Sequence, residues 1–392
     1  ASGTPMVNFG QDSSFAGNKT AQGNADGNGK GDFYYAPPSG YLALCTANMP
    51  DPVETIDPAQ GGSPQDYVQT KLYTGNGQSS LDIDLDFSPD WVWIKRRTAS
   101  QSYVVANKLS GDDKFIASNS NSAEETDNTK FRNFLTNSFR VGSHNGVNNN
   151  GSTYVSWNWK ANGSGGSNTN GTINTTSTTV AAHGGFSIST YTGTGSNATV
   201  GHGLSSAPSY VIIKERNGTE NWVVGFGDFT GRLLLDNNEA FADTDAQWRD
   251  TVPSSTVVTI GTHASVNRNN SATYVMYCFA DVDGMQKSGT YTGNENVDGT
   301  FVYTGFRPSF ILIKKLAAGD WGIYDNKRLG YNDDNAVLYP SEDIAEGNQA
   351  SRKIDLLSNG FKLRTTNVTF NDDSTTTFLA FAEQSFKYSN AR

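Results

Sequence analysis

The sequence has little cysteine and no long apolar stretch. Cys45 and Cys278 are the two cysteines in 392 residues, too few and too far apart for a disulfide framework. Each lies in an apolar run, so we expect both as small buried side chains in strands. No run of about 18 apolar residues is present, which argues against a membrane-spanning helix. The first 35 residues also lack the basic start and apolar stretch of a signal peptide.

Charge is scarce and mostly negative. Charged residues make up 17% of the chain and the formal net charge is −10. Nucleic acid is therefore not expected as the main partner, because phosphate binding needs clustered Lys and Arg. Hydrophobic residues reach only 35%, while 41 glycines and many Asn, Ser and Thr residues fill the polar remainder. Aromatic residues at 11% exclude a disordered polymer, so the composition favours short strands, polar turns and aromatic cores.

The motifs of enzymatic chemistry are missing as well. None of the four histidines has the spacing of a zinc site, and no Cys-x-x-Cys, nucleophile elbow or phosphate-binding loop occurs. His202 precedes a turn in one part of the chain, where we expect it to form a turn or surface hydrogen bond. The sequence therefore predicts no catalytic residue, no cofactor site and no metal site, and favours a protein that is not an enzyme.

The strongest positive signal is an internal repeat in three copies. Each copy opens with Tyr-Thr-Gly, and about 16 residues later it has a proline, an aromatic residue, an apolar run and a lysine. Each closes with a strongly aromatic segment. In order, these landmarks are residues 73–75, 89–95 and 154–159, then 191–193, 208–214 and 274–279, then 291–293, 308–314 and 378–382.

The repeat predicts an all-β chain of tandem β-sandwich or jelly-roll units, each of roughly 100 residues, with little helix. Short amphipathic helical turns are expected only within residues 122–135 and 341–357. The predicted organisation is an N-terminal segment at 1–50, a linker at 51–68, repeat 1 at 69–161, a flexible linker rich in Gly, Ser, Asn and Thr at 162–183, repeat 2 at 184–283 and repeat 3 at 284–392.

Three carboxylates alternate along one predicted strand, at Asp82, Asp84 and Asp86. Oxygen ligands of this kind suit Ca²⁺, but alternate side chains on a strand are about 6.5–7 Å apart, too far for all three to close on one ion. The main interpretation is a solvated acidic face, and the alternative is a calcium site completed by other loops. Asp372 and Asp373 are expected as turn residues, as are Asp333 and Asp334.

Other repeated side chains have two interpretations each. The lysines that end the apolar run (Lys95, Lys214 and Lys314) mark the point where a strand leaves the core, or else bind a ligand in every copy. Trp222 and Trp321 pack in the interior, or else form a platform on which sugars stack. The remaining strand tryptophans are expected in a core or an interface, namely Trp91, Trp93, Trp157 and Trp159.

Several segments resemble phage proteins. Residues 7–11 and 33–50 look like the closing strands of phage-encoded SPRY-type (concanavalin-like) sandwich domains, although the early strands of that domain are absent. The repeats resemble an uncharacterised repeat domain of tail-fibre-like proteins of marine bacteriophages. The matching pieces are residues 201–204, 303–308, 358–363 and 386–392.

This resemblance implies a non-enzymatic structural protein on the exterior of a phage particle, as a tail fibre, appendage or capsid-surface fibre. Its implied partners are other virion proteins, further copies of itself in a homo-oligomer, and glycans of the host surface. A trimer is expected by analogy with phage fibres. The alternatives are a polysaccharide-degrading tailspike and a secreted bacterial lectin or adhesin.

Overall fold

The computed structural model describes residues 6–269, 271–328, 332, 336–348 and 351–389. Asp333 and Asp334, which were expected as turn residues, lie outside this part of the chain. The chain divides into two compact units, Ala1–Pro52 and Val53–Arg392. Within the described ranges, no helix is long and apolar enough to cross a membrane.

The N-terminal unit is held by turns rather than by a sheet. Between residues 6 and 52, its regular structure consists of a β-bridge between Asn24 and Phe33 and the 3-10 helix η1 (Thr46–Asn48). Burial opposes the charge of Asp26, but hydrogen bonds from the backbone of Lys30 and Ala43 and from other donors outweigh it and lower the pKa of Asp26 to about 2. Cys45 was expected to be buried in a strand, and this prediction is wrong, because Cys45 is exposed at the start of η1.

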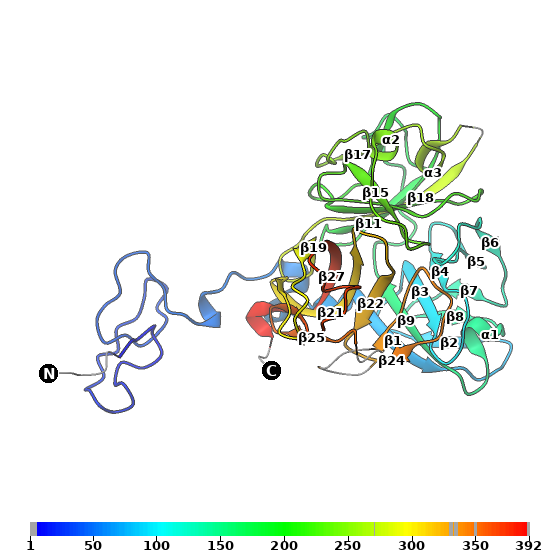
Figure 1. The fold of residues 1–392 in the computed structure, drawn as a ribbon. Coiled ribbons are helices and arrows are strands. Elements are labelled where there is room, and N and C mark those ends of the chain that lie inside the picture. Colours follow the sequence, from blue (N-terminus) through cyan, green and yellow to red (C-terminus); the bar gives the residue numbers. More distant parts are fainter. Residues whose placement is uncertain (1–5, 270, 329–331, 333–335, 349–350, 390–392) are drawn as a thin grey trace. The chain divides into compact units, whose positions relative to one another are not determined.

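The larger unit is built from antiparallel strands, which confirms the predicted all-β class (Figure 1). Each repeat contributes a four-stranded arrangement with the same order, and a smaller sheet packs against one face of it. In repeat 1 the strands are β1 (Val68–Thr74), β2 (Leu81–Asp84), β3 (Trp91–Arg96), β4 (Val104–Asn107), β5 (Lys114–Phe115), β6 (Glu125–Thr126), β7 (Phe131–Phe134), β8 (Ser138–Val141) and β9 (Thr153–Trp159). They form the sheets β1-β9-β3-β4, β2-β8-β7 and β5-β6.

Repeat 2 has the same plan with a wider main sheet. Its strands are β10 (Ser177–Val180), β11 (Phe186–Thr192), β12 (Ala198–Gly201), β13 (Tyr210–Glu215), β14 (Val223–Phe226), β15 (Gly231–Leu234), β16 (Ala242–Asp243), β17 (Val257–Ile260) and β18 (Thr273–Phe279). The main sheet has the order β10-β11-β18-β13-β14-β15-β16, and β12 pairs with β17 in the smaller sheet. Within this sheet, the four strands β11-β18-β13-β14 have the same order as β1-β9-β3-β4 of repeat 1.

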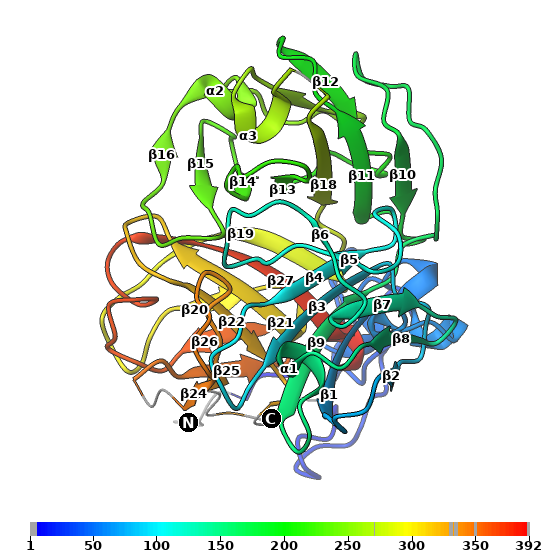
Figure 2. The ribbon, with the colours of Figure 1, turned by 90° about the vertical axis from the view of Figure 1, so that its right-hand side faces the viewer.

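Repeat 3 completes the pattern. Its strands are β19 (Gln286–Thr292), β20 (Phe301–Tyr303), β21 (Phe306–Lys315), β22 (Trp321–Asp325), β23 (Ala336–Val337), β24 (Gly347–Asn348), β25 (Ile354–Leu357), β26 (Gly360–Leu363) and β27 (Thr375–Ser385). The sheets are β19-β27-β21-β22, β20-β26-β25 and β23-β24. Figure 2 shows the smaller sheets of the three repeats on different sides of the unit.

Helices are few and short among the described residues. They are α1 (Asn145–Asn148), α2 (Asp245–Trp248) and α3 (Ala264–Asn267), together with the 3-10 helices η2 (Glu54–Ile56), η3 (Pro58–Gln60), η4 (Pro64–Asp66) and η5 (Phe386–Tyr388). The helical turns expected at 122–135 and 341–357 are absent from the described parts of these ranges, which form strands β6, β7, β24 and β25 instead. Alternate burial along β25 has the period of a strand, not of a helix.

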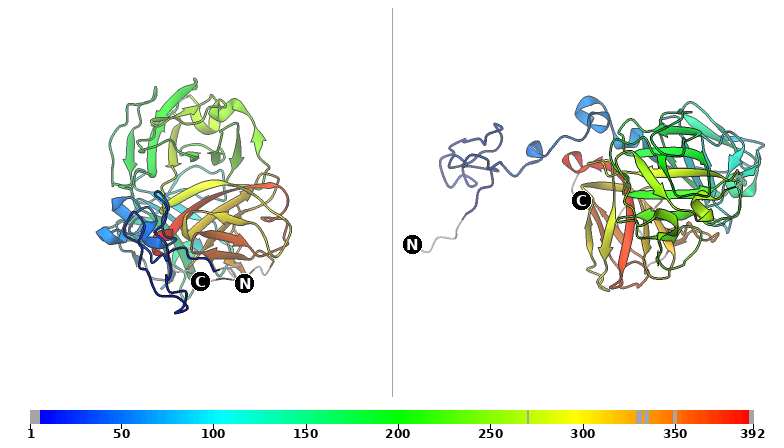
Figure 3. Two further views of the ribbon diagram at one scale, coloured as in Figure 1. Left: turned by 90° about the vertical axis from the view of Figure 1, so that its left-hand side faces the viewer. Right: turned by 90° about the horizontal axis from the view of Figure 1, so that it is seen from above.

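The three repeats are not separate units, because they share one hydrophobic core. The main sheet of each repeat buries one face against its own smaller sheet and the other face in a central core built from all three repeats. Trp159, Phe279 and Phe381 occupy the same position in the three main sheets and meet there. The ring centroid of Phe381 lies 5.6 Å from that of Trp159 and 5.7 Å from that of Phe279. Figure 3 shows the three repeats around this centre in two further views.

The same backbone hydrogen bond joins each repeat to the next, which closes the three repeats into a ring. The residue two positions after the repeated lysine offers its carbonyl oxygen, and a loop of another repeat donates an N–H. The three bonds are Glu124 N to Arg216 O (2.6 Å), Phe241 N to Leu316 O (2.7 Å) and Glu346 N to Arg97 O (2.9 Å). The first joins repeat 1 to repeat 2, the second joins repeat 2 to repeat 3, and the third joins repeat 3 back to repeat 1.

The two expected linkers are partly built into the fold. Residues 162–183 include β10, which pairs with β11, because the Thr-rich end of this segment favours strand structure more than its Gly-rich start. Within the 51–68 segment, Ile56 is fully buried in the central core. Gln65 also donates a hydrogen bond to the carbonyl oxygen of Ala382 over 3.0 Å. Residues 53–68 therefore belong to the three-repeat unit.

Candidate functional site

The repeated lysines are buried inside the fold. Lys95, Lys214 and Lys314 have no exposed surface, and each Nζ donates hydrogen bonds to backbone carbonyl oxygens at the end of its strand or beyond it. The bonds are 2.5 to 3.3 Å long. Lys95 donates to Gln101 and Asp343, Lys214 donates to Glu215 and Gly218, and Lys314 donates to Lys315 and Ala317. Burial lowers the pKa of each amine to about 8. The alternative of a ligand-binding lysine does not fit these amines, because they hold turns together.

The opening Tyr-Thr-Gly also has a structural explanation. The tyrosine hydroxyl donates to the backbone of the polar loop before the last strand, at Val147 from Tyr73 (3.0 Å) and at Val266 from Tyr191 (2.7 Å). Tyr291 makes the same bond to Phe370 (2.8 Å). The glycine must lack a side chain, since a Cβ at Gly75 would collide with a backbone carbonyl oxygen.

A buried asparagine in each repeat was not identified from the sequence. Asn148, Asn267 and Asn371 have no exposed surface, and each holds the loop that follows Tyr-Thr-Gly. Asn267 shows the pattern: its Oδ1 accepts from the backbone N–H of Thr194 (2.7 Å), and its Nδ2 donates to the carbonyl oxygens of Ser196 (2.5 Å) and Gly261 (3.0 Å). The three asparagines lie in Asn-rich loops, so composition alone does not distinguish them from their exposed neighbours.

The four histidines share one local role. The Nδ1 atom of each accepts a hydrogen bond from the backbone N–H two residues later, which leaves Nε2 to carry the proton of the neutral ring. The four bonds are Gly146 to His144 (2.9 Å), Gly185 to His183, Leu204 to His202 and Ser265 to His263 (each 3.1 Å). Burial lowers the pKa of all four, to about 4 for His183. The predicted turn hydrogen bond of His202 is confirmed, although the side chain is buried.

Trp222 and Trp321 are interior residues, not a sugar platform. They are 1% and 0% exposed, and their indoles point into the neighbouring repeat. Trp222 Nε1 donates to the carbonyl oxygen of Ala117 (3.0 Å), and Trp321 Nε1 donates to that of Leu234 (2.7 Å). The other four strand tryptophans (Trp91, Trp93, Trp157 and Trp159) are also buried, as the sequence predicted, and so is Cys278.

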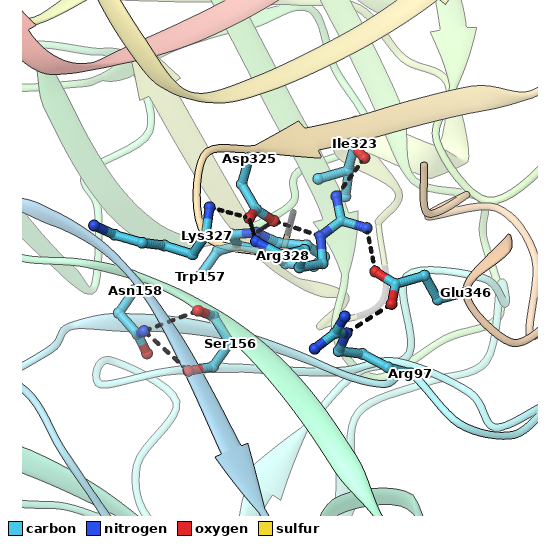
Figure 4. Close-up of polar contacts among 9 residues, drawn as sticks. All are labelled: Arg97, Ser156, Trp157, Asn158, Ile323, Asp325, Lys327, Arg328 and Glu346. Atoms are coloured by element: carbon cyan, nitrogen blue, oxygen red, sulfur yellow. Dashed lines mark hydrogen bonds and ion pairs between the residues drawn. The ribbon is translucent and has the colours of Figure 1, made fainter. Parts of the chain in front are cut away.

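A buried ion cluster lies where repeat 3 meets repeat 1 (Figure 4). Arg328 is fully buried and contacts Asp325 Oδ2 (2.6 Å) and Glu346 Oε1 (3.0 Å). Glu346 also pairs with Arg97 (2.7 Å), and Trp157 Nε1 donates to Asp325 (3.0 Å). The cluster links two segments that are more than 150 residues apart in the sequence, so no local motif signals it. Its charges are satisfied by one another, and its role is to close the ring of repeats.

The acidic strand does not gather its carboxylates. Asp82 forms a two-point ion pair with Arg140 (2.5 and 2.8 Å), and Asp86 accepts from Gln69 (2.6 Å). Asp84 is exposed. In the described part of the chain, no three His, Cys, Asp or Glu side chains are grouped so that they could hold a metal ion. The geometry fits the solvated acidic face that was the main interpretation.

Asp86 also lines a polar hollow with a volume of about 430 Å³. The hollow combines three carboxylates with the amine of Lys160, whose Nζ lies 5.4 Å from the centre of the Tyr67 ring. The residues around it are Glu54, Thr55, Gln60, Gly61, Gly62, Asp66, Tyr67, Asp86, Phe87 and Lys160. These groups can accept hydrogen bonds from the hydroxyls of a sugar and donate hydrogen bonds to them.

One family model matches residues 63–385, which is most of the chain and includes all three repeats. The chain belongs to the family described as domain of unknown function (DUF7483). The DUF7483 match starts at the cap of η4 and ends with the last residue of β27. The family unit therefore coincides with the closed ring, not with one repeat. A comparison with curated proteins finds no match.

Proposed function

We propose that this protein is a non-enzymatic structural component on the exterior of a bacteriophage particle, as a tail fibre, appendage or capsid-surface fibre. The resemblance of the repeats to tail-fibre-like proteins suggested this role. Its partners would be other virion proteins, copies of itself and saccharides of the host surface. The observation that carries the proposal is that the repeated polar side chains form hydrogen bonds to the protein's own backbone.

In each repeat, polar side chains of the kinds that can take part in catalysis form internal hydrogen bonds. The amine of Lys214, the amide of Asn267 and the imidazole of His263 all bond to backbone groups of their own repeat. Residues equivalent to Lys214 and Asn267 hold turns and loops in both other repeats, and His144 does the same in repeat 1, so their recurrence needs no catalytic explanation. A rigid ring whose polar groups are used internally suits a building block that must keep its shape.

The exterior suits a role at a crowded surface. The net charge of −10 and the polar loops favour solubility at high local concentration. The hollow around Asp86 and Lys160 offers hydrogen-bond partners for saccharide hydroxyls. Weak sites on several copies in one particle would act together through their high effective concentration.

The test is to label intact particles with an antibody against the protein and to image them by electron microscopy. We expect label on the tail or the capsid surface. Particles without label, purified from cells that make the protein, would contradict the proposal. Turnover of a polysaccharide by the purified protein, abolished by one carboxylate substitution, would favour the tailspike alternative instead.

A further inference from the structure

The smaller sheets of the three repeats contain one equivalent strand each: β2, β12 and β20. Each has a central residue that faces inward and pairs with a strand of the same sheet, namely Ile83 with Phe139, Val200 with Val258 and Val302 with Phe361. The two residues beside it face the other side of the sheet. They are Asp82 and Asp84 in repeat 1, Thr199 and Gly201 in repeat 2, and Phe301 and Tyr303 in repeat 3.

This comparison separates what the fold requires from what it does not. All three inward residues are buried, so the fold requires an apolar side chain there. The flanking positions hold acids in one repeat and a threonine and a glycine in another, and the sheet forms in both. Repeat 3 alone places two aromatic rings there, with Phe301 43% and Tyr303 53% exposed. Neighbouring exposed aromatic side chains that the fold does not need are a sign of a binding surface.

Both rings have a glycine beneath them. A Cβ at Gly360 would lie 3.0 Å from the ring of Phe301, and a Cβ at Gly305 would lie 3.5 Å from the hydroxyl of Tyr303. Each ring can therefore rest close to the backbone while about half of the side chain remains exposed. Residues at alternate positions of a strand are about 6.5–7 Å apart on the same face, so one saccharide chain could contact both rings, and we call the two side chains the aromatic platform.

Two lysines lie beside this platform in a protein of net charge −10. Lys362 is the cross-strand neighbour of Phe301, and Lys287 Nζ lies 5.3 Å from the centre of the Tyr303 ring. Lys362 and Arg364 both contact Asp298, at 2.5 and 3.4 Å, and Arg364 also contacts Asp355 at 3.2 Å. Three cations thus stand beside two carboxylates, which leaves a local excess of positive charge.

We propose that Phe301 and Tyr303 form the stacking platform for an acidic saccharide, a chain of sugars that carry carboxylates. The C–H faces of sugar rings are apolar and pack on aromatic faces, as do other flat apolar groups. The carboxylates of the sugars would lie near Lys287 and Lys362. The inference rests on the saccharide contact of the proposed function and names its ligand class and its residues.

The substitution that tests this is F301T/Y303G, which installs the two residues that repeat 2 carries at these positions. Because repeat 2 forms its sheet with them, we expect the variant to fold, with a circular dichroism spectrum like that of the wild type. The matched control is Asp84→Asn, at the position of repeat 1 that corresponds to Tyr303. The measurement is isothermal titration of the 392-residue protein with hexamers of galacturonate, glucuronate and guluronate, and with an uncharged glucose hexamer.

We expect at least one uronate hexamer to bind the wild type and the D84N protein at least tenfold more tightly than it binds F301T/Y303G, and raised salt to weaken the binding. Equal affinity of the wild type and F301T/Y303G for the uronates would overturn the proposal. So would no binding of any uronate, or tighter binding of the glucose hexamer. If F301T/Y303G instead changed the mass in light scattering while no saccharide bound, the surface would be a contact between copies. Label on particles without uronate binding would leave the virion role standing and remove the platform.

Discussion

The indole Nε1 of Trp321 donates a hydrogen bond to the carbonyl oxygen of Leu234 over 2.7 Å, from repeat 3 into repeat 2. Trp222 makes the same bond from repeat 2 to Ala117 of repeat 1. In repeat 1 the equivalent position is Tyr103, whose buried hydroxyl has no hydrogen-bond partner among the described residues. The junctions between repeats therefore follow one plan but differ in chemistry, and this difference can be tested.

Trp321→Phe should destabilise the ring, because it removes the donor and leaves the buried carbonyl oxygen of Leu234 unpaired. We expect a loss of about 1–3 kcal/mol in the free energy of unfolding from the hydrogen bond, measured by denaturant titration. Trp91→Phe is the control, since the Nε1 of Trp91 has no hydrogen-bond partner in the described structure. A similar loss in both variants would mean that ring volume, not the hydrogen bond, is what matters.

The contributions of Arg216 and Glu124 to the free energy of unfolding should depend on each other. Its two contacts are 2.8 and 2.9 Å long and both side chains are largely buried, so each single variant, Arg216→Leu or Glu124→Leu, leaves a charge that lacks its main partner. We expect each to lower the free energy of unfolding by about 2 kcal/mol and the double variant to lose clearly less than the sum. Leu316 and Phe241 fill the equivalent junction without charge. Additive losses in the double-mutant cycle would contradict this expectation.

Asn267→Asp should disrupt repeat 2 strongly. The two donors of Nδ2 would be replaced by an acceptor that faces the carbonyl oxygens of Ser196 and Gly261, in a fully buried position. We expect a loss of about 3 kcal/mol or more, measured as a lower melting temperature at neutral pH. The exposed Asn150 provides the control, since Asn150→Asp should have almost no effect. Equal effects of the two substitutions would remove the role that we give to the buried amide.

The buried lysines should make the protein more stable as the pH rises above about 8. Their folded pKa is about 8 and the ordinary value is 10.5, so between these values the unfolded chain binds more protons than the folded one. The free energy of unfolding contributed by these groups therefore increases with pH across this range and is lowest below it. Lys214→Met should reduce this slope, seen as the difference from the wild type in denaturant titrations at pH 8 to 9.5. Parallel curves would show that Lys214 does not titrate in this way.

Light scattering tests the homo-oligomer that we propose for this protein. We expect a homo-oligomer, a trimer by analogy with phage fibres, since identical chains commonly form closed symmetric assemblies. The measurement is the mass at micromolar concentration across a dilution series. A stable monomer at every concentration would count against the trimer.

The sequence alone determined the repeat and its strand character. Pro, aromatic, apolar run and Lys recur three times because each copy needs the same turn, the same doubly buried strand and the same buried amine. The interior position of Trp91 and Trp157 followed from this pattern, since a strand that is apolar on both faces must be covered on both. The all-β class was predictable for the same reason.

Tertiary structure alone decided what covers the second face of each main sheet. Nothing within one copy shows that Trp159, Phe279 and Phe381 meet, because a sheet can bury its outer face against any apolar partner. The ion cluster of Arg328 and Glu346, which joins repeat 3 to repeat 1, could not be predicted from the sequence either, because its members lie far apart in the chain. The platform of Phe301 and Tyr303 was missed because exposure depends on the register of β20, in which Val302 and not its neighbours takes the inward position.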